Sequence, residues 1–197
     1  GRGVLVSIGH HRADQAAIDA AVAAGARMCT HLGNGLDATV HRLDNPIWRQ
    51  LGDDRLWASF IADNQHLPGP TLRCMLRAKT VARSILVTDA MAAAGMPPGR
   101  YRLGSAEVER TPAGRVVLPG TPYLAGSAAD MPTCITHAIV DGGVTLDEAL
   151  TMASMNPARL LLGETTPSPA AGTVELVWHA DQRRLEIRSV TAGEFTA

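Results

Sequence analysis

Four short apolar runs in the first half of the chain end in polar side chains that could bind a metal ion or transfer a proton. His10, His31 and Asp89 follow three of these runs, and Asp63 with His66 follows the fourth. Histidine and aspartate serve both as metal ligands and as general acids and bases. Because the carboxyl ends of parallel strands open onto one face of a barrel, we expect these residues to converge. The pattern predicts an enzyme, and a metal-dependent hydrolase in particular.

The elements that must position these residues have the pattern of buried parallel strands separated by helices. Asp14 can cap a first helix and Gly25 can end it. The apolar runs predict strands over residues 4–8, 26–30, 56–62 and 84–88, and the segments between them predict helices over residues 15–24 and 70–81. This alternation is typical of stacked βα units.

The pattern changes after residue 90. Two alternating runs between residues 101 and 118, separated by a turn at 111–114, predict an inserted hairpin. The remaining sequence predicts helices over 128–140, 146–154 and 157–162. A linker over 165–172 and terminal strands over 173–178 and 185–190 are predicted to follow.

Only four strands of the barrel type are predicted, whereas a closed (β/α)₈ barrel needs eight. We therefore expect an α/β fold that forms the C-terminal half of a TIM-type metal-dependent hydrolase barrel, with the inserted hairpin and the terminal β strands added. The chain also begins in a strand-like run without an initiating methionine, which indicates that an upstream part is missing.

The composition excludes several other classes of protein. Of 197 residues, 46% are hydrophobic and 19% are charged, which is typical of a globular protein. The net charge of -1 gives no reason to expect binding to nucleic acid or to anionic lipid. Three widely spaced cysteines argue against a disulfide framework, and no apolar stretch approaches the roughly 20 residues of a membrane span. A cytoplasmic protein that acts on a small molecule is the expectation.

A set of short motifs follows in a fixed order along most of the chain. They are Ile8-Gly9-His10, Thr30-His31-Leu32-Gly33-Asn34-Gly35, His41-Arg42, Ile61-Ala62-Asp63 with His66, Thr88-Asp89-Ala90-Met91, Leu124-Ala125-Gly126-Ser127 and Ser154-Met155-Asn156-Pro157-Ala158-Arg159. The ordered set resembles that of the N-acetylglucosamine-6-phosphate deacetylases of the amidohydrolase superfamily. The resemblance implies hydrolysis of the N-acetyl amide of an amino sugar 6-phosphate to acetate and the free amine.

The resemblance also implies roles for individual residues. His10 and His31 would be the imidazole ligands of a divalent metal, zinc first and iron as the alternative. Asp89 would take a proton from the attacking water and deliver it to the departing amine. Arg42 would bind the phosphate. The remaining substrate contacts would come from Asn34, Gly35, His66, Leu124, Gly126 and Ser127.

The resemblance implies further parts that these residues do not supply. A carboxylate metal ligand and a histidine that polarises the substrate carbonyl would come from the first half of the barrel, so the 197 residues alone are expected to be inactive. Residues 1–163 would form the second half of the barrel, and residues 164–197 would form a linker and strands of a small β-domain. A homo-oligomer is expected for the complete protein.

Other interpretations of the same residues stay open at this point. Two strand-end histidines can be satisfied by ordinary hydrogen bonds, Asp89 can cap a helix, and Arg42 can be a solvated surface arginine. The enzyme could instead act on an unphosphorylated N-acyl or cyclic amide. The alternative outside the enzymes is a non-catalytic half-barrel that serves as a binding module or provides contacts for oligomer assembly.

Overall fold

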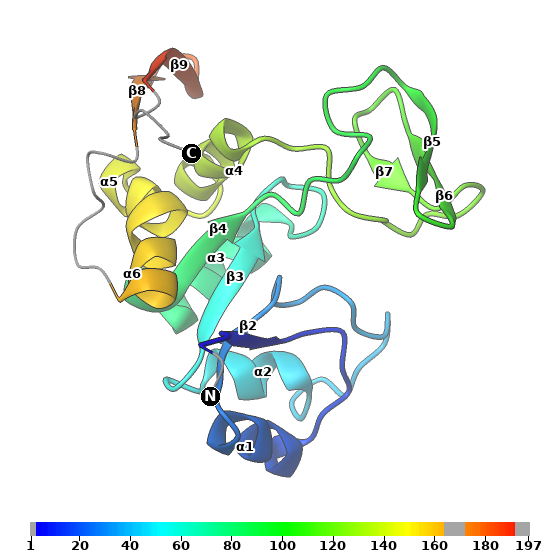
Figure 1. Ribbon diagram of the computed structural model, residues 1–197, viewed down its shortest axis with the longest axis vertical. Coiled ribbons are helices and arrows are strands. Elements are labelled where there is room, and N and C mark those ends of the chain that lie inside the picture. The colour runs from blue at the N-terminus through cyan, green and yellow to red at the C-terminus, as the bar shows by residue number, and fades with distance from the viewer. Residues whose placement is uncertain (1–2, 164–171, 192–197) are drawn as a thin grey trace.

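A computed structural model describes residues 3–163 and 172–191 (Figure 1). Its main sheet has four parallel strands in the order β1-β2-β3-β4, so the order in space is the order along the chain. The strands are β1 (Val6–Ile8), β2 (Ala26–Cys29), β3 (Trp57–Ile61) and β4 (Ser84–Val87). The chain is therefore an α/β protein with a parallel sheet, as the sequence predicts.

Three helices and a short 3₁₀ turn connect these strands. They are α1 (Gln15–Ala23), α2 (Pro46–Leu51), α3 (Gly69–Lys79) and η1 (Val81–Arg83). The Asp14 carboxylate accepts a hydrogen bond from the Ala17 amide at 2.9 Å, so the predicted cap of α1 is confirmed. Helix α2 was not expected, although Asn45 caps it and Pro46 opens it, both common start signals.

The core lies between the sheet and its helices. Cys29, Ala58 and Phe60 are fully buried in the strands and belong to the same cluster as Ile18 and Leu72 from the helices. Burial raises the pKa of the Cys29 thiol to about 12, so this cysteine is a small core residue.

Three antiparallel strands follow β4 and form a separate small sheet, which projects from the main body in Figure 1. They are β5 (Gly99–Leu103), β6 (Ala106–Arg110) and β7 (Val116–Val117). The sequence predicted one hairpin with its turn at residues 111–114, and that turn does join β6 to β7. The first predicted run also folds back on itself, because Gly104 adopts a φ of 58° between β5 and β6.

The next helices are α4 (Met131–Val140), α5 (Leu146–Leu150) and α6 (Asn156–Leu162). A π-helical segment, η2 (Thr151–Met155), joins α5 to α6 without a break, where the sequence predicted two separate helices. Asn156, which is fully buried, follows this segment. Its Nδ2 donates to the carbonyl oxygens of Val81 and Ser84, both at 2.7 Å, and so ties α6 to the start of β4.

The terminal strands β8 (Thr173–His179) and β9 (Arg184–Thr191) pair as an antiparallel hairpin. Leu185 is buried in the main core, and Leu176 and Trp178 pack against that core. Residues 164–171, where most of the linker was expected, lie outside the described residues. Within the described ranges, no helix has the length and apolar character that crossing a bilayer requires.

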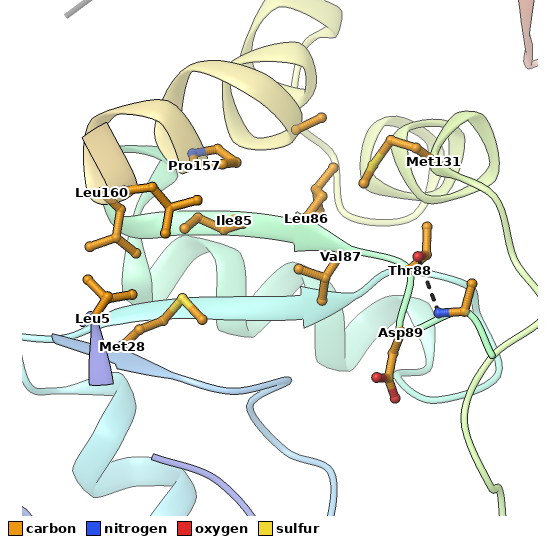
Figure 2. Close-up of a pocket in the computed structure, with 13 residues that line it drawn as sticks. Leu5, Met28, Ile85, Leu86, Val87, Thr88, Asp89, Met131, Pro157 and Leu160 are labelled. Carbon is orange, nitrogen blue, oxygen red and sulfur yellow. Dashed lines mark hydrogen bonds between the residues drawn. The ribbon is translucent and has the colours of Figure 1, made fainter. Parts of the chain in front are cut away.

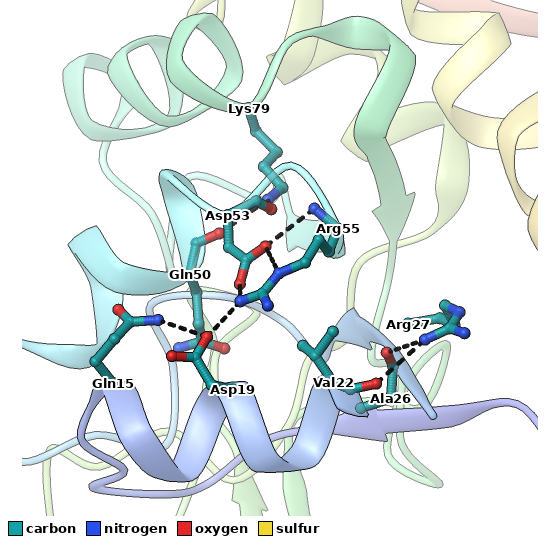
Figure 3. A network of polar contacts seen from close by, with 9 residues as sticks. All are labelled: Gln15, Asp19, Val22, Ala26, Arg27, Gln50, Asp53, Arg55 and Lys79. Atoms are coloured by element: carbon teal, nitrogen blue, oxygen red, sulfur yellow. Dashed lines mark hydrogen bonds and ion pairs between the residues drawn. The ribbon is translucent and has the colours of Figure 1, made fainter. Parts of the chain in front are cut away.

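A polar network, buried at Lys79 and half exposed at Arg55 and Asp19, links the first three helices (Figure 3). Its centre is Lys79, the only lysine of the chain, which is 3% exposed. Its Nζ donates to the carbonyl oxygens of Gln50 at 2.8 Å and Asp53 at 2.6 Å. Arg55 then bridges the carboxylates of Asp53 and Asp19. Burial lowers the pKa of Lys79. The hydrogen bonds from Lys79 to the two carbonyl oxygens link the end of α3 to the end of α2.

Candidate active site

The structure places four polar residues at equivalent positions of the main sheet. His10, His31, Asp63 and Asp89 each lie two residues beyond the last residue of β1, β2, β3 and β4 respectively. Because the four strands are parallel and adjacent, all four residues lie at the carboxyl edge of one sheet. This is the edge at which α/β proteins bind their ligands.

Three of these residues share an unusual backbone conformation. The φ angles are 51° for His10, 30° for His31 and 51° for Asp89, a region that residues other than glycine adopt in only a few per cent of cases, with asparagine, aspartate and histidine the most frequent among them. Such a conformation costs about 1–3 kcal/mol and persists where neighbouring contacts impose it. The amide of His31 donates to Ser59 Oγ at 2.7 Å, and the amide of Leu32 donates to the Ser59 carbonyl at 2.8 Å. The strand β3 therefore holds the turn that follows β2.

The imidazole rings of His10 and His31 meet directly. Their Nε2 atoms are 2.9 Å apart, and their ring centroids are 4.7 Å apart at an angle of 54°. Two ring nitrogens this close can both reach one cation at the usual distance of about 2.0–2.1 Å. His31 is 8% exposed, and its Nδ1 is buried without a hydrogen-bond partner among the described residues. The pair therefore fits two ligands of a divalent metal.

Asn34 and Gly35 pack directly onto this histidine pair. The backbone amide and Nδ2 of Asn34 both donate to the His31 carbonyl, at 3.0 and 3.2 Å. Gly35 has a φ of 67°, and a Cβ built on it would lie 2.7 Å from His10 Cδ2. The sequence analysis assigned Gly35 to substrate contact, and in the structure the His10 ring occupies the space that a Cβ at this position would need.

A second group of contacts surrounds Asp63. Its Oδ2 lies 2.8 Å from Nδ1 of His66 and accepts from Ser127 Oγ at 3.2 Å, and its Oδ1 accepts from the amides of Gln65 and His66. The side chains of Asp63 and His66 are only 5% and 6% exposed. Burial acts to raise the pKa of Asp63, but the hydrogen bonds from His66 and Gln65 outweigh burial and lower that pKa.

Asp89 is held beside this second group through its backbone. The amide of Ser127 donates to the Asp89 carbonyl at 2.9 Å, and the amide of Met91 donates to the Ser127 carbonyl at 3.1 Å. Ser127 therefore lies beside the end of β4, whereas Leu124, three residues earlier, bridges to Val117 of β7. The residues after Asp89 form turns and not a helix, so there is no helix there for Asp89 to cap.

A largely apolar cavity of about 510 Å³ lies along the strands that lead to Asp89 (Figure 2). In this view Asp89 lies just beyond the end of β4. Apolar side chains from β2, β4 and α6 line the rest of the cavity. These apolar residues include Met28, Ile85, Val87 and Leu160.

Arg42 lies outside both groups. It is exposed in the loop before α2, where its carbonyl accepts from Trp48 Nε1 at 3.0 Å. Asp63, by contrast, was not among the site residues that the sequence argument assigned. The sequence analysis had placed it at a strand end with the other three but gave it no role. Ser59 carried no such signal, because its contact with His31 depends on the register of β2 and β3.

The described residues contain no group of three or more histidine, cysteine, aspartate or glutamate side chains arranged to hold one metal ion. The two histidines therefore supply only part of a complete coordination shell. The class defined by the fold and these residues is an α/β protein with polar side chains gathered at the carboxyl edge of its parallel sheet, as in many enzymes that bind small molecules.

Comparisons with known proteins narrow this class. The chain is 38% identical over 179 residues to an N-acetylgalactosamine-6-phosphate deacetylase of Escherichia coli O157:H7, covering 88% of this chain and 46% of that protein. It is 39% identical over 152 residues to a putative N-acetylgalactosamine-6-phosphate deacetylase of E. coli K12, covering 74% of this chain and 89% of that protein. No protein-family model matches the chain.

A solved structure agrees with these relatives. A variant N-acetyl-D-glucosamine-6-phosphate deacetylase from Mycobacterium smegmatis, in complex with N-acetyl-D-glucosamine-6-phosphate, aligns with a TM-score of 0.73 and 34% identity. The alignment covers 81% of this chain and 42% of that one. The chain belongs to the family of N-acetylglucosamine-6-phosphate and N-acetylgalactosamine-6-phosphate deacetylases. It spans 46% of the first relative and 42% of the M. smegmatis protein.

Proposed function

We propose that the natural protein that carries this sequence hydrolyses the N-acetyl amide of an amino sugar 6-phosphate and releases acetate and the free amine. The observation that best supports this proposal is the contact between His10 and His31, whose Nε2 atoms lie 2.9 Å apart at neighbouring strand ends. The family of the chain supplies the substrate class, and its relatives are named for both the gluco and the galacto sugar.

The fold proposed for the complete protein is a (β/α)₈ barrel of which this chain contributes the C-terminal half. The four parallel strands lie in the sheet in the same order as along the chain, as neighbouring strands of such a barrel do, and this supports the proposal. A carboxylate ligand and a histidine that polarises the carbonyl would come from the other half, so the 197 residues alone would be inactive. The small β-domain of residues 164–197, a homo-oligomer and a cytoplasmic location belong to the same proposal.

The proposed chemistry assigns His10 and His31 to a divalent cation, zinc or iron by ligand type. Such a cation, when bound, supplies a Lewis acid that polarises a carbonyl and acidifies water. Asp89 would take the proton of the attacking water and pass it to the nitrogen of the departing amine. Its position at the same sheet edge as the histidines supports this role.

Substrate binding would fall to residues around the two groups. His66, oriented by Asp63 through a 2.8 Å contact at its Nδ1, would contact the sugar through its Nε2. Asn34, Gly35, Leu124, Gly126 and Ser127 would line the same space, and Arg42 would reach the phosphate from its exposed loop.

The test is acetate release by the natural full-length protein, comparing N-acetylglucosamine 6-phosphate, N-acetylgalactosamine 6-phosphate and unphosphorylated N-acetylglucosamine. Asp89→Asn should lower kcat roughly 10²–10⁴-fold, because it removes proton transfer and leaves the histidines untouched. Metal analysis should show an unchanged cation content in Asp89→Asn and a reduced content in His31→Ala.

The matched control is Asp54→Asn, the same substitution at an exposed carboxylate, which should keep full activity. Near-normal kcat for Asp89→Asn would remove Asp89 from the reaction. Faster turnover of the unphosphorylated sugar would favour an amidohydrolase for a different N-acyl substrate.

A further inference from the structure

The loop that carries Arg42 joins β2 to α2, and both of its ends are linked to the segment that follows β1. At its first end, Gly35 packs on the ring of His10. At its other end, Asp44 directly precedes the cap of α2 and forms an ion pair with Arg49 of that helix. Arg49 also contacts the segment after β1, so its side chain links the regions that the proposed function assigns to the metal ion and to the phosphate.

Arg49 uses the two ends of its guanidinium group for different partners. Its Nη1 donates to the carbonyl oxygen of Ala13 at 2.9 Å, and its Nη2 contacts the carboxylate of Asp44. Ala13 lies three residues beyond His10 and directly before Asp14, the cap of α1. The Arg49 side chain is 18% exposed, so water has limited access to it. A planar group with donors fixed at both ends suits two separate acceptors better than a single ammonium group does.

The contact with Asp44 extends to Arg42 through the end of the loop. The amide of Asp44 donates to Nδ1 of His41 at 2.9 Å, and Nδ2 of Asn45 donates to the His41 carbonyl at 2.8 Å. The carbonyl of Arg42 itself accepts from Trp48 Nε1 of α2. These contacts form a turn against the start of α2, so a side chain that restrains Asp44 also restrains the backbone of Arg42.

A second ion pair joins the same loop to the same segment, but it lies in water. Arg12 Nη2 is 2.5 Å from Asp37 Oδ1, and the two side chains are 81% and 43% exposed. Exposed pairs of this kind contribute little to stability, because solvent screens them and two long side chains must be held in place. Arg49 is therefore the shielded link between the loop and the segment after β1, and the pair of Arg12 with Asp37 is its exposed counterpart.

We propose that Arg49 is a positioning residue that sets the separation between the histidine pair and Arg42. It thereby favours substrates whose phosphate lies at a fixed distance from the reacting amide. The inference rests on the proposed function for its ligand, because one amino sugar 6-phosphate must reach the metal ligands and Arg42 at the same time. A molecule held at both ends gains affinity only where the spacing of the two binding groups matches its own length. Arg49 acts through Asp44 and the turn, since its guanidinium group is already occupied by Ala13 and Asp44.

The first measurement is hydrogen–deuterium exchange over residues 36–45 of the natural full-length protein, which reports on the loop without any ligand. Arg49→Gln should speed exchange in this loop by about fivefold to tenfold, since it removes a hydrogen bond and an ion-pair contact. Arg12→Gln is the matched control at the exposed pair and should leave exchange nearly unchanged. Equal exchange in the wild-type protein and in Arg49→Gln would overturn the proposal.

The second measurement is the steady-state release of acetate from N-acetylglucosamine 6-phosphate and from unphosphorylated N-acetylglucosamine. Arg49→Gln should raise KM for the phosphorylated sugar about tenfold with a much smaller change in kcat. It should leave kcat/KM for the unphosphorylated sugar and the cation content at their wild-type values, because the histidines are untouched. A merely structural role would lower activity on both sugars alike, so an equal loss on both would also overturn the proposal.

Further variants test the two contacts of Arg49. Asp44→Asn should raise KM for the phosphorylated sugar by a smaller factor, because Asp44 is exposed and its contact is the more screened of the two. The double variant Arg49→Gln/Asp44→Asn should be no worse than Arg49→Gln alone, and additive effects would contradict one shared chain of contacts. If Arg49→Gln does not fold, Arg49→Lys keeps the charge without the planar fork and should show the same selective rise in KM.

Failure of this inference and failure of the proposed function give different results. A wild-type protein that releases no acetate from either sugar contradicts the proposed function, and the exchange measurement still decides whether Arg49 holds the Arg42 loop. An active protein in which Arg49→Gln changes neither exchange nor KM overturns the positioning role and leaves the proposed function intact.

Discussion

At the scale of single residues, His10, His31 and Asp89 combine a shared sheet edge with positive φ angles. The residue types at His10, His31 and Asp89, each after an apolar run, were enough to predict that they share one sheet edge. Nothing in the sequence indicated their positive φ angles or the hydrogen bond from the His31 amide to Ser59. Both depend on the register between strands, which local residue patterns do not encode.

Asp63 gives a prediction at this scale. Its folded pKa is lowered, so its charged form stabilises the fold above the ordinary carboxyl pKa, and this contribution is lost as the pH falls through the lowered folded value. Asp63→Asn should therefore reduce the free energy of unfolding at pH 7 by roughly 1.5–3 kcal/mol, because it weakens charge-assisted hydrogen bonds. Urea unfolding at pH 7 and at acid pH measures the difference.

The difference between wild type and Asp63→Asn should shrink as the pH drops below about 4. Asp54→Asn, at an exposed carboxylate, serves as the control and should change stability little at either pH. A destabilisation by Asp63→Asn that stays constant down to low pH would mean that its charge is not what stabilises the fold.

At the scale of elements, the strongly apolar strands were predicted well because burial imposes a clear pattern on them. Helix α2 was missed, since six residues are too few to show a helical period and its Asn45-Pro46 start was the only signal. The π-helical segment between α5 and α6 was also not predictable. The contact made by Asn156, which directly follows this segment, depends on the position of β4, and local residue patterns do not encode that position.

Asn156→Ala tests that dependence. The substitution leaves the carbonyl oxygens of Val81 and Ser84 without their donor in a fully buried place. We expect a loss of roughly 1–3 kcal/mol in the free energy of unfolding. Faster hydrogen exchange in β4 should accompany it.

Ser154→Ala is the neighbouring control, because Ser154 is exposed and its hydroxyl donates only within its own helix, to the Leu150 carbonyl. It should leave both measurements nearly unchanged. Equal effects of the two variants would contradict a specific link between α6 and β4.

At the scale of the whole molecule, the terminal hairpin packs with the main core. Leu185 of β9 is 6% exposed within the main hydrophobic cluster, and Trp178 of β8 packs against it. Leu185→Ala should lower the free energy of unfolding by about 2–4 kcal/mol and leave a single thermal transition. Differential scanning calorimetry checks both expectations.

Val190→Ala is a control on the same strand, because Val190 is 65% exposed. It should shift the transition little. Two separate transitions in the wild-type protein, one of them alone sensitive to Leu185→Ala, would show instead that the terminal strands fold as an independent unit.

Several exposed apolar side chains lie beside the main sheet. Val4 next to β1 is 75% exposed, and Leu161 and Leu162 of α6 are 65% and 67% exposed. Leu161 also lines the apolar cavity along β4. An exposed apolar surface of this kind is typical of a face that another element covers, and it supports the proposed barrel.

The agreement between strand order and chain order bears on how the protein is made. Each strand pairs with the strand synthesised just before it, so the sheet can grow on the ribosome in the direction of translation. His10 and His31, only 21 positions apart, can therefore meet while Asp89 is still untranslated. A nascent chain that has emerged only as far as β3 would already hold its paired imidazoles, and would acquire the carboxylate last.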